Sequence, residues 1–410
     1  MEICIFEDNE YAKLNPLVLT RPVYELRCGM TTLREKIARQ FPDRQLSLHC
    51  RDYLADAVRE DHPDAKVNEI ASAQCLFING RVLADEGFAN KMDPHWEGVY
   101  HKGQTVVAAM LKGAALEKVK AQLGRPLEGS LFQGLNVRPI EAKVISYPWE
   151  LVHENASQIE ADFEFLNAGG KIEGKLYDRV TLLEKENIFV GPGSTIKPGV
   201  VLDAEGGPIY IGRKVTILPN AVLEGPAFVG DGSIIKIGAK IYEGTSIGEV
   251  CKVGGEVEES IIHSYSNKQH DGFLGHAYLG SWINLGANTN NSDLKNNYGS
   301  IKVYINGQLV DSGSQFVGLF MGDHSKSGIN TMFNTGTVVG VMCNVYGGGY
   351  PPKFIPSFVW GGAEGLVEYQ LEKALDTARR VMARRKVELT PAKEKVLRTV
   401  FELTKTERMV

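Results

Sequence analysis

Aliphatic residues recur at every sixth position through a long stretch in the second half of the chain. They stand, without a gap, at Ile211, Ile217, Leu223, Val229, Ile235, Ile241, Ile247 and Val253. The positions two places before the last seven are small or β-branched, namely Val215, Ala221, Ala227, Ser233, Ala239, Thr245 and Cys251. A six-residue period fits a short strand plus a turn, with two inward residues on one face. Stacked hexads of this kind predict a parallel β-helix whose aliphatic columns form one continuous core.

The hexad pattern extends over residues 188 to 362, with two interruptions. After Val253 the register is lost, and its expected restart at Phe273 predicts a polar insertion in between. The second interruption, residues 288 to 314, contains alternating apolar residues before Asn306 and Gly307, which is a β-hairpin signal. Hexads then return at Met321. The interruptions are the places where adaptable polar side chains are expected, because regular coils are committed to packing.

The first 165 residues mix strand-like and helical runs, which favours an α/β domain. The runs lie at residues 3 to 6, 31 to 40, 75 to 78 and 108 to 123. Helical spacing over residues 147 to 163 predicts a linker helix, with the domain boundary near it. We therefore predict an α/β domain at 1–165, a linker at 166–187, the β-helix at 188–362 and a helical tail at 363–410.

Composition narrows the choice of partners and compartment. The formal net charge of −5 gives no general reason to expect nucleic acid or an anionic membrane as a partner. Six cysteines are scattered without CxxC spacing, as in reduced cytoplasmic proteins. No window approaches the roughly 18 uninterrupted apolar residues of a membrane span. A soluble, cytoplasmic protein is expected.

The stretch from Ser264 to Asp293 is the richest in chemistry. It holds His270, His276 and Lys268, and His263 stands just upstream of it. A positioned imidazole is a general base at neutral pH, and a lysine attracts phosphate. We single out His270 as the base, with His276 as the alternative, and Lys268 as a candidate phosphate contact.

The stretch HDGFLGHAYLGSWINLGANT resembles the left-handed β-helix acyltransferases. The resemblance is greatest to the bifunctional N-acetylglucosamine-1-phosphate uridyltransferases and glucosamine-1-phosphate N-acetyltransferases. It implies a left-handed β-helix, transfer of an acetyl group from acetyl-CoA to an amino-sugar 1-phosphate, and a homotrimer. On this register His270 falls on the family's catalytic base, Asn284 on a substrate-contacting asparagine, and Lys295 approximately on a phosphate-binding lysine. Phe273 replaces a tyrosine that contacts the sugar phosphate, so one hydroxyl is missing.

The later coils occupy the region where the family docks the coenzyme. The resemblance therefore makes Gly322, Lys326 and Gly340 candidates for acetyl-CoA binding. An oxyanion forming at the thioester carbonyl needs fixed donors, which exposed backbone amides in glycine-rich turns supply. The turns at Gly286 and Gly322 are the candidates.

By the same resemblance the first domain is expected to be a Rossmann-like nucleotidyltransferase. Arg21, Arg27 and Lys36 follow the first strand, where a triphosphate would be met by side chains. The family places a Mg²⁺-binding aspartate near the position of Arg81, and an arginine cannot bind Mg²⁺. Asp8 and Asp85 are alternative carboxylates between which spacing does not choose. The domain either transfers nucleotides, forming UDP- or dTDP-sugars, or has degenerated into a nucleotide-binding or assembly module.

Two other functions stay open at the level of the whole chain. One is a non-catalytic sugar-nucleotide sensor or assembly protein, which would bind such molecules without turnover. The other is a zinc-dependent hexapeptide enzyme, with the metal held between coils by imidazoles. His263, His270, His276 and His324 are the available ligands.

Overall fold

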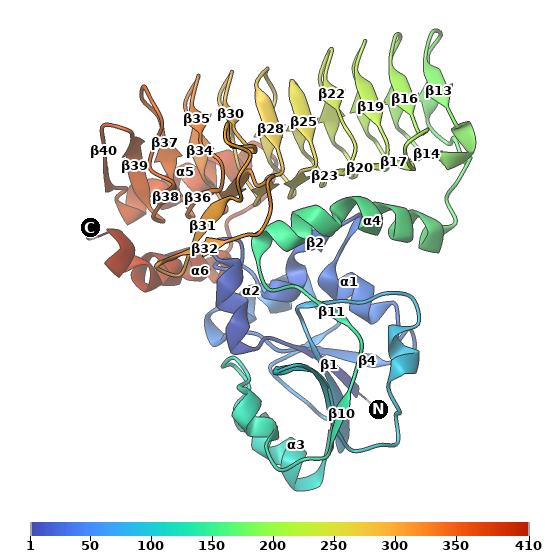
Figure 1. Cartoon of the computed structure of the whole chain (residues 1–410), viewed down its shortest axis with the longest axis vertical. Helices are drawn as coiled ribbons and strands as arrows, with labels where there is room; N and C mark the ends of the chain where they lie inside the picture. The colour runs from blue at the N-terminus through green and yellow to red at the C-terminus, as the bar shows by residue number, and fades with distance from the viewer. Residues whose placement is uncertain (1, 409–410) are drawn as a thin grey trace.

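A computed structural model describes residues 2–408 of the chain. A long stack of β-coils forms one side of the molecule, and the N-terminal α/β domain lies beneath it (Figure 1). The helix α4 (Pro148–Leu166) runs along the underside of the stack and connects the two parts. The predicted fold class, an α/β nucleotidyltransferase-like domain followed by a hexapeptide-type β-helix and C-terminal helices, is confirmed.

A seven-stranded sheet forms the centre of the N-terminal domain, in the order β10-β8-β9-β6-β1-β4-β5. The central strands β1, β4 and β6 are parallel, and β9 pairs with β6 in the antiparallel sense. Its strands are β1 (Glu2–Phe6), β4 (Gln45–Leu48), β5 (Lys66–Val67), β6 (Gln74–Asn79), β8 (Gly98–Lys102), β9 (Thr105–Lys112) and β10 (Val137–Pro139). The shorter strands are β2 (Arg27–Cys28), β3 (Thr31–Thr32), β7 (Val82–Leu83) and β11 (Lys143–Val144), and the helices are α1 (Leu33–Ala38), α2 (Asp52–Asp61) and α3 (Gly113–Lys120).

The strands of the β-helix form three parallel faces. The first face holds β12 (Lys175–Leu176), β15 (Thr195–Ile196), β18 (Thr216–Ile217), β21 (Ile234–Ile235), β24 (Lys252–Val253), β27 (Asn267–Lys268), β34 (Lys326–Ser327), β37 (Asn344–Val345), β39 (Val359–Gly362) and the antiparallel β40 (Gly365–Glu368). The second holds β13 (Thr181–Leu183), β16 (Val201–Asp203), β19 (Val222–Glu224), β22 (Lys240–Ile241), β25 (Glu256–Glu258), β28 (Phe273–Gly275), and then β30 (Asn290–Asn291) and β35 (Met332–Phe333). The third holds β14 (Ile188–Val190), β17 (Ile209–Ile211), β20 (Ala227–Val229), β23 (Thr245–Ile247), β26 (Ile261–Ile262), β29 (Tyr278–Leu279), β33 (Leu319–Met321), β36 (Thr337–Val339) and β38 (Phe354–Ile355).

Three corners join these faces, and we name them by the face they follow. Corner A follows the third face, corner B the first and corner C the second. In a regular coil each residue lies above the one 18 positions later, as Thr216 pairs with Ile234 and Ile234 with Lys252. Three hexads therefore complete one coil. All eight aliphatic residues of the predicted column are buried in one continuous core, as the hexad pattern predicts.

The predicted insertion after Val253 is wrong, because the β-helix continues through this region with shortened corners. Strands β25 to β28 pair in register with their neighbours. Val253 and Val257 are both inward although they are only four positions apart, so the register shifts. Leu274 rather than Phe273 consequently points into the core, and Lys268 takes the inward position above Val253.

The second interruption does leave the stack, as predicted. Strands β31 (Lys302–Ile305) and β32 (Gln308–Asp311) form a hairpin around Asn306 and Gly307, both of which have positive φ. Its apolar face packs into a cluster shared with the N-terminal domain and the third face. Strand pairing also begins earlier than the predicted start at 188, since β12 and β13 already form a partial coil within the segment predicted as linker.

Two helices, α5 (Leu371–Ala383) and α6 (Pro391–Leu403), close the chain, and α6 packs against α2 of the N-terminal domain (Figure 1). Thr390 caps α6 through the backbone amide of Lys393, with Pro391 at its first position. In the described part of the chain no helix combines the length and apolarity needed to cross a bilayer. The helix α4 and the N-terminal domain pack against the third face. Corner A therefore lies close to the place where the N-terminal domain, the β-helix and the C-terminal helices meet.

Candidate active site

His270 lies at corner B with its side chain exposed. The corner beneath it is held by Lys268, whose ammonium donates hydrogen bonds to the carbonyls of Gly254 (2.9 Å) and His270 (3.0 Å). Lys268 is only 2% exposed, and burial lowers the pKa of its ammonium to about 8. A contact between Lys268 and a sugar phosphate would require the side chain to leave this interior position.

Cations collect on the first face next to this corner. The aliphatic part of the Lys236 side chain passes over Gly254, which has no side chain to obstruct it. The backbone of Gln269, one coil further along, also lies close to Gly254. Arg385, two residues after the end of α5, donates a 2.8 Å hydrogen bond to the Asn267 side chain. Within residues 2–408, Lys236, Lys252, Arg384 and Arg385 have no carboxylate within ion-pair distance. We call these four residues the cationic strip.

The charges of the cationic strip affect one another. Burial lowers the pKa of Lys252, and the neighbouring charges of Arg385, Lys236 and Arg384 lower it further. Like charges held together without counter-charges create a local positive potential, even in a chain of net charge −5. An anion that binds there relieves this repulsion. Asn284 lies on the same face, exposed and one coil beyond Asn267, so it adds an amide to the strip.

His276 lies at a different corner, corner C. Its Nδ1 is 2.9 Å from Oδ2 of Asp293, and its ring stacks on Phe316 with centroids 5.0 Å apart. A carboxylate on one ring nitrogen fixes the tautomer and leaves the other nitrogen as a base, which is the usual way of orienting a catalytic histidine. Asp293 was not singled out from the sequence, because it lies 17 residues after its partner. His276 and His270 therefore belong to two separate places.

The remaining predicted substrate and coenzyme residues are dispersed. Lys295 donates to the carbonyl of Ser300 inside the excursion, and the backbone N–H of the half-buried Phe273 donates to the side-chain oxygen of Asn290. Gly322 and Gly340 are stacked on each other at corner A, where a Cβ on Gly322 would lie 2.9 Å from the Gly340 backbone. These two glycines are packed rather than open.

Lys326 lies on the first face, beside Asn284. Its ammonium donates a 2.7 Å hydrogen bond to the carbonyl of His324, and burial lowers its pKa to about 8. Of the three residues predicted to bind acetyl-CoA, Lys326 alone shares a face with the cationic strip. The assignment of all three stays a prediction.

The predicted triphosphate cations do not converge on one phosphate position in this structure. Arg21 is paired with Asp323 of corner A, and Arg27 reaches Glu249 of the same corner at 2.7 Å. Lys36 is fully buried and pairs at 2.6 Å with Asp162 of α4. Each cation is thus neutralised by a carboxylate that joins separate segments of the fold. Their role in triphosphate binding stays a prediction.

Both carboxylates proposed for Mg²⁺ are already paired with cations. Asp8 is held by the guanidinium of Arg81, at 2.9 and 2.6 Å, and by the side-chain amide of Asn79 at 2.8 Å. Arg81 is 1% exposed, so this pair fills the end of the first strand. Asp85 is paired with Lys91. No group of three or more potential ligands occurs in the part of the chain that the structure describes.

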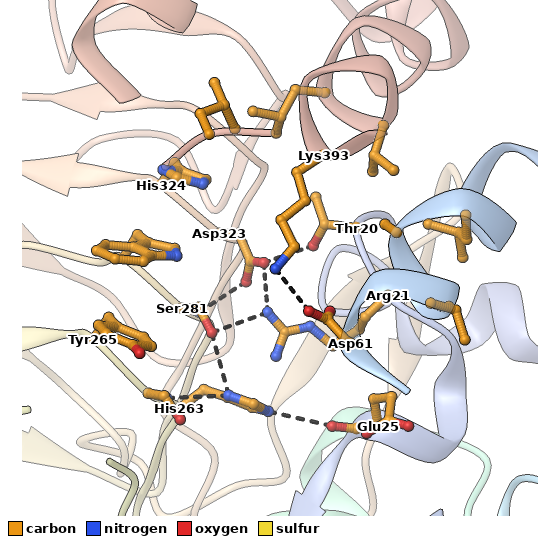
Figure 2. A pocket seen from close by; sticks show the side chains of 18 of the residues that line it. Thr20, Arg21, Glu25, Asp61, His263, Tyr265, Ser281, Asp323, His324 and Lys393 are labelled. Carbon is orange, nitrogen blue, oxygen red and sulfur yellow. Dashed lines mark hydrogen bonds and ion pairs between the residues drawn. The ribbon is translucent and has the colours of Figure 1, made fainter. Parts of the chain in front are cut away.

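The four histidines considered for zinc are likewise separated. His270 is at corner B and His276 at corner C, whereas His263 and His324 line a pocket near corner A (Figure 2). Among the described residues, these imidazoles do not form a three-ligand cluster. The zinc hypothesis therefore lacks a ligand set in this structure.

The class that the fold and site define is a sugar nucleotidyl transferase-like domain joined to a hexapeptide β-helix. Residues 3–171 match the family model described as sugar nucleotidyl transferase. This match covers the N-terminal domain and α4, and together with the bifunctional relatives described next it confirms the resemblance predicted from the sequence.

Particular relatives are proteins named as bifunctional. A bifunctional sugar-1-phosphate nucleotidylyltransferase/acetyltransferase of Sulfurisphaera tokodaii is 31% identical over 106 residues, which are 25% of this chain and 26% of that protein. The bifunctional protein GlmU of a Synechococcus species (strain RCC307) is 30% identical over 183 residues, 44% of this chain and 34% of that protein. The chain thus matches about a third or less of the length of these relatives. A solved UDP-N-acetylglucosamine acyltransferase aligns over 58% of this chain and 87% of its own, with 14% identity and a TM-score of 0.24.

Proposed function

We propose that the protein transfers an acetyl group from acetyl-CoA to the amine of an amino-sugar 1-phosphate at corner B. The observation that carries this proposal is the exposed imidazole of His270 beside the unpaired cationic strip. A base next to a phosphate-attracting surface is what this acceptor needs. The matching stretch around His270 and the two activities named for the relatives support the same reaction.

The residues would act as follows. The cationic strip binds the sugar phosphate, and the exposed amide of Asn284 orients the sugar by hydrogen bonds. The amine attacks the thioester carbonyl while His270 accepts the proton that the amine loses. The C–S bond then breaks, and the coenzyme leaves as a thiolate that takes up a proton to become the thiol. Proton transfer by a positioned base contributes roughly 10²–10⁴-fold to such a step.

The same proposal includes a homotrimer. Corner B carries the exposed apolar side chains of Ile237 (68% exposed) and Ile329 (71% exposed), which lie four coils apart along the stack. Exposed apolar residues of this kind become buried when β-helices pack side by side. Light scattering at micromolar concentration checks the oligomeric state, and a monomer would contradict the proposed assembly.

The test measures thiol release from acetyl-CoA with glucosamine 1-phosphate, with galactosamine 1-phosphate and with no acceptor. We expect acceptor-dependent release, and a loss of at least about a hundredfold in His270→Ala. The matched control is His95→Ala, an exposed histidine of the N-terminal domain, which should match the wild type. A loss in His276→Ala with His270→Ala unaffected would move the base to corner C. Tight binding without any release would favour a sensor.

A second activity, nucleotidyl transfer, is proposed because residues 3–171 match sugar nucleotidyl transferases. The pairing of Asp8 with Arg81 gives it no Mg²⁺ site at the end of the first strand. Pyrophosphate release should be measured with UTP and dTTP and each sugar phosphate, over a series of Mg²⁺ concentrations. Absence of release throughout would reject this activity for these nucleotides and leave the domain with a binding or assembly role.

A further inference from the structure

Lys252 belongs to the cationic strip and lies on β24 of the first face. Because the neighbouring Val253 points into the core, the side chain of Lys252 points outward, and the residue is partly exposed. In the next coil it pairs with Asn267, whose side chain accepts the hydrogen bond of Arg385. The amine of Lys252 therefore lies at the surface of the first face, beside the segment that follows α5.

The charged groups around this amine are all positive. Within residues 2–408 its ammonium has neither a carboxylate nor a hydrogen-bond partner, and the charges that act on it are those of Arg385, Lys236 and Arg384. Burial lowers the pKa of Lys252, and these three charges lower it further. A lysine is a nucleophile only in its neutral form, which neighbouring cations favour. Lys252 should therefore react with acyl donors more readily than an ordinary surface lysine.

Two other lysines of the β-helix each lack one of the two requirements, an accessible amine and a lowered pKa. Lys268 is 2% exposed and its ammonium donates to two backbone carbonyls, so an acyl donor cannot approach it in the folded chain. Lys240 is exposed, but the carboxylate of Glu256 lies 3.1 Å from its ammonium and raises its pKa. These two residues are the internal comparisons for Lys252.

Lys252 also lies close to the place where the proposed function puts acetyl-CoA. Its partner Asn267 stands three positions before His270, on the strand that leads into corner B. A thioester held at corner B for attack by a sugar amine is thus near the amine of the lysine as well, and proximity raises the effective concentration of one group for the other. In the absence of an acceptor, Lys252 is a nucleophile beside an unused donor.

We propose that Lys252 is a modification site, which acetyl-CoA acetylates when no acceptor is bound. The donor in this inference rests on the proposed function, whereas the reactivity of the amine does not. The neutral amine attacks the thioester carbonyl and the C–S bond breaks. The proton lost by the amine passes to the thiolate, so the products are N-acetyllysine and the coenzyme thiol.

Acetylation removes one positive charge from the cationic strip. The strip attracts phosphate through charges that have no carboxylate partner, so the loss of one of them weakens its hold on a sugar phosphate. The modification would therefore reduce acceptor binding when the coenzyme is present in excess over the acceptor.

The first experiment incubates the full chain near pH 7.5 with acetyl-CoA or with p-nitrophenyl acetate, a donor that needs no coenzyme site. Peptide mass spectrometry follows each lysine with time. With both donors Lys252 should be acetylated at least about fivefold faster than Lys240, and Lys268 should stay unmodified. Lys353 controls for position, because its pKa is also lowered but it precedes β38 of the third face. With acetyl-CoA, Lys252 should be acetylated faster than Lys353.

Arg385→Gln tests the effect of the neighbouring charge. It removes one cation beside Lys252 and should slow acetylation of Lys252 at least about twofold, with Lys240 unchanged. The proposal is overturned if Lys252 reacts no faster than Lys240, if Arg385→Gln leaves its rate unchanged, or if p-nitrophenyl acetate modifies Lys252 and acetyl-CoA does not.

The consequence for the acceptor is measured by calorimetry with glucosamine 1-phosphate. Lys252→Gln removes the charge as acetylation does, and should weaken binding at least about threefold. Lys252→Arg keeps the charge and cannot be acetylated, so it should bind within about twofold of the wild type. Equal binding by both variants would overturn the regulatory effect. Acetylation of Lys252 in a protein that shows no acceptor-dependent thiol release would reject the proposed function and leave the modification site standing.

Discussion

A lysine at an inward position of a β-helix should make stability depend on pH in a way that one substitution removes. Lys268 lies in the column of Val253 and is 2% exposed, and burial lowers its pKa from 10.5 to about 8. The unfolded chain keeps the proton up to about pH 10.5, whereas the folded chain loses it near pH 8. Between these values the unfolded state binds more protons, so the unfolding free energy rises with pH.

The size of this rise follows from the shift in pKa. A difference of about 2.5 units corresponds to about 3 kcal/mol, at 1.36 kcal/mol per unit. Lys268→Met keeps the length of the side chain and removes the titrating group. The wild type should therefore gain up to about 3 kcal/mol relative to Lys268→Met between pH 7 and pH 10.5.

The assay is urea unfolding of both proteins at several pH values in this range, followed by far-ultraviolet circular dichroism. Groups that titrate in both proteins cancel in the difference. Lys185→Met, at an exposed lysine of the same domain, is the control and should show no pH-dependent difference from the wild type. A difference between wild type and Lys268→Met that stays constant within about 0.5 kcal/mol would refute the buried position of the ammonium.

Other substitutions test the packing and the domain contacts. Ile235→Ala removes a side chain from the core and should lower the unfolding free energy by about 2–5 kcal/mol. Ile237→Ala, two residues away and 68% exposed, should change the unfolding free energy little. Equal effects of the two substitutions would contradict the register of the β-helix. Burial alone would raise the pKa of Glu249, but Arg27 and nearby hydrogen bonds lower it to about 2. The stability from this ion pair is therefore present above about pH 4.5 and lost as the pH falls toward 2. The melting temperature of Arg27→Met should accordingly lie below that of the wild type at pH 6 and approach it near pH 2, and a gap independent of pH would contradict the pairing.

The regular part of the β-helix could be predicted from the sequence because every inward side chain repeats with one period. Residues 211 to 253 obey that period and were placed correctly. The prediction failed after Val253 because two corners lose residues there, and corner length leaves little trace in hydrophobicity. Lys268 adds to the difficulty, since a lysine at an inward position reads as polar surface.

The residues of the candidate site could be named but not grouped. His270 and Asn284 were found by resemblance, and both are exposed next to the cationic strip. The strip itself combines two segments about 150 residues apart, residues 236 to 252 and 384 to 385, and only the folded chain brings them together. The partners of Arg21 and Arg27 also lie more than 200 residues away, so no local pattern could have revealed them.

These long-range pairs bear on what the N-terminal domain does. Arg21 and Arg27 follow the first strand, where a nucleotidyl transferase would meet its triphosphate, yet both hold carboxylates of corner A. Asp8 is occupied by Arg81 at the end of the same strand. A triphosphate entering this place would have to displace Asp323 and Glu249 from their arginines. Nucleotide binding at this place would therefore require Arg21 and Arg27 to separate from corner A, which couples it to the contact between the two domains.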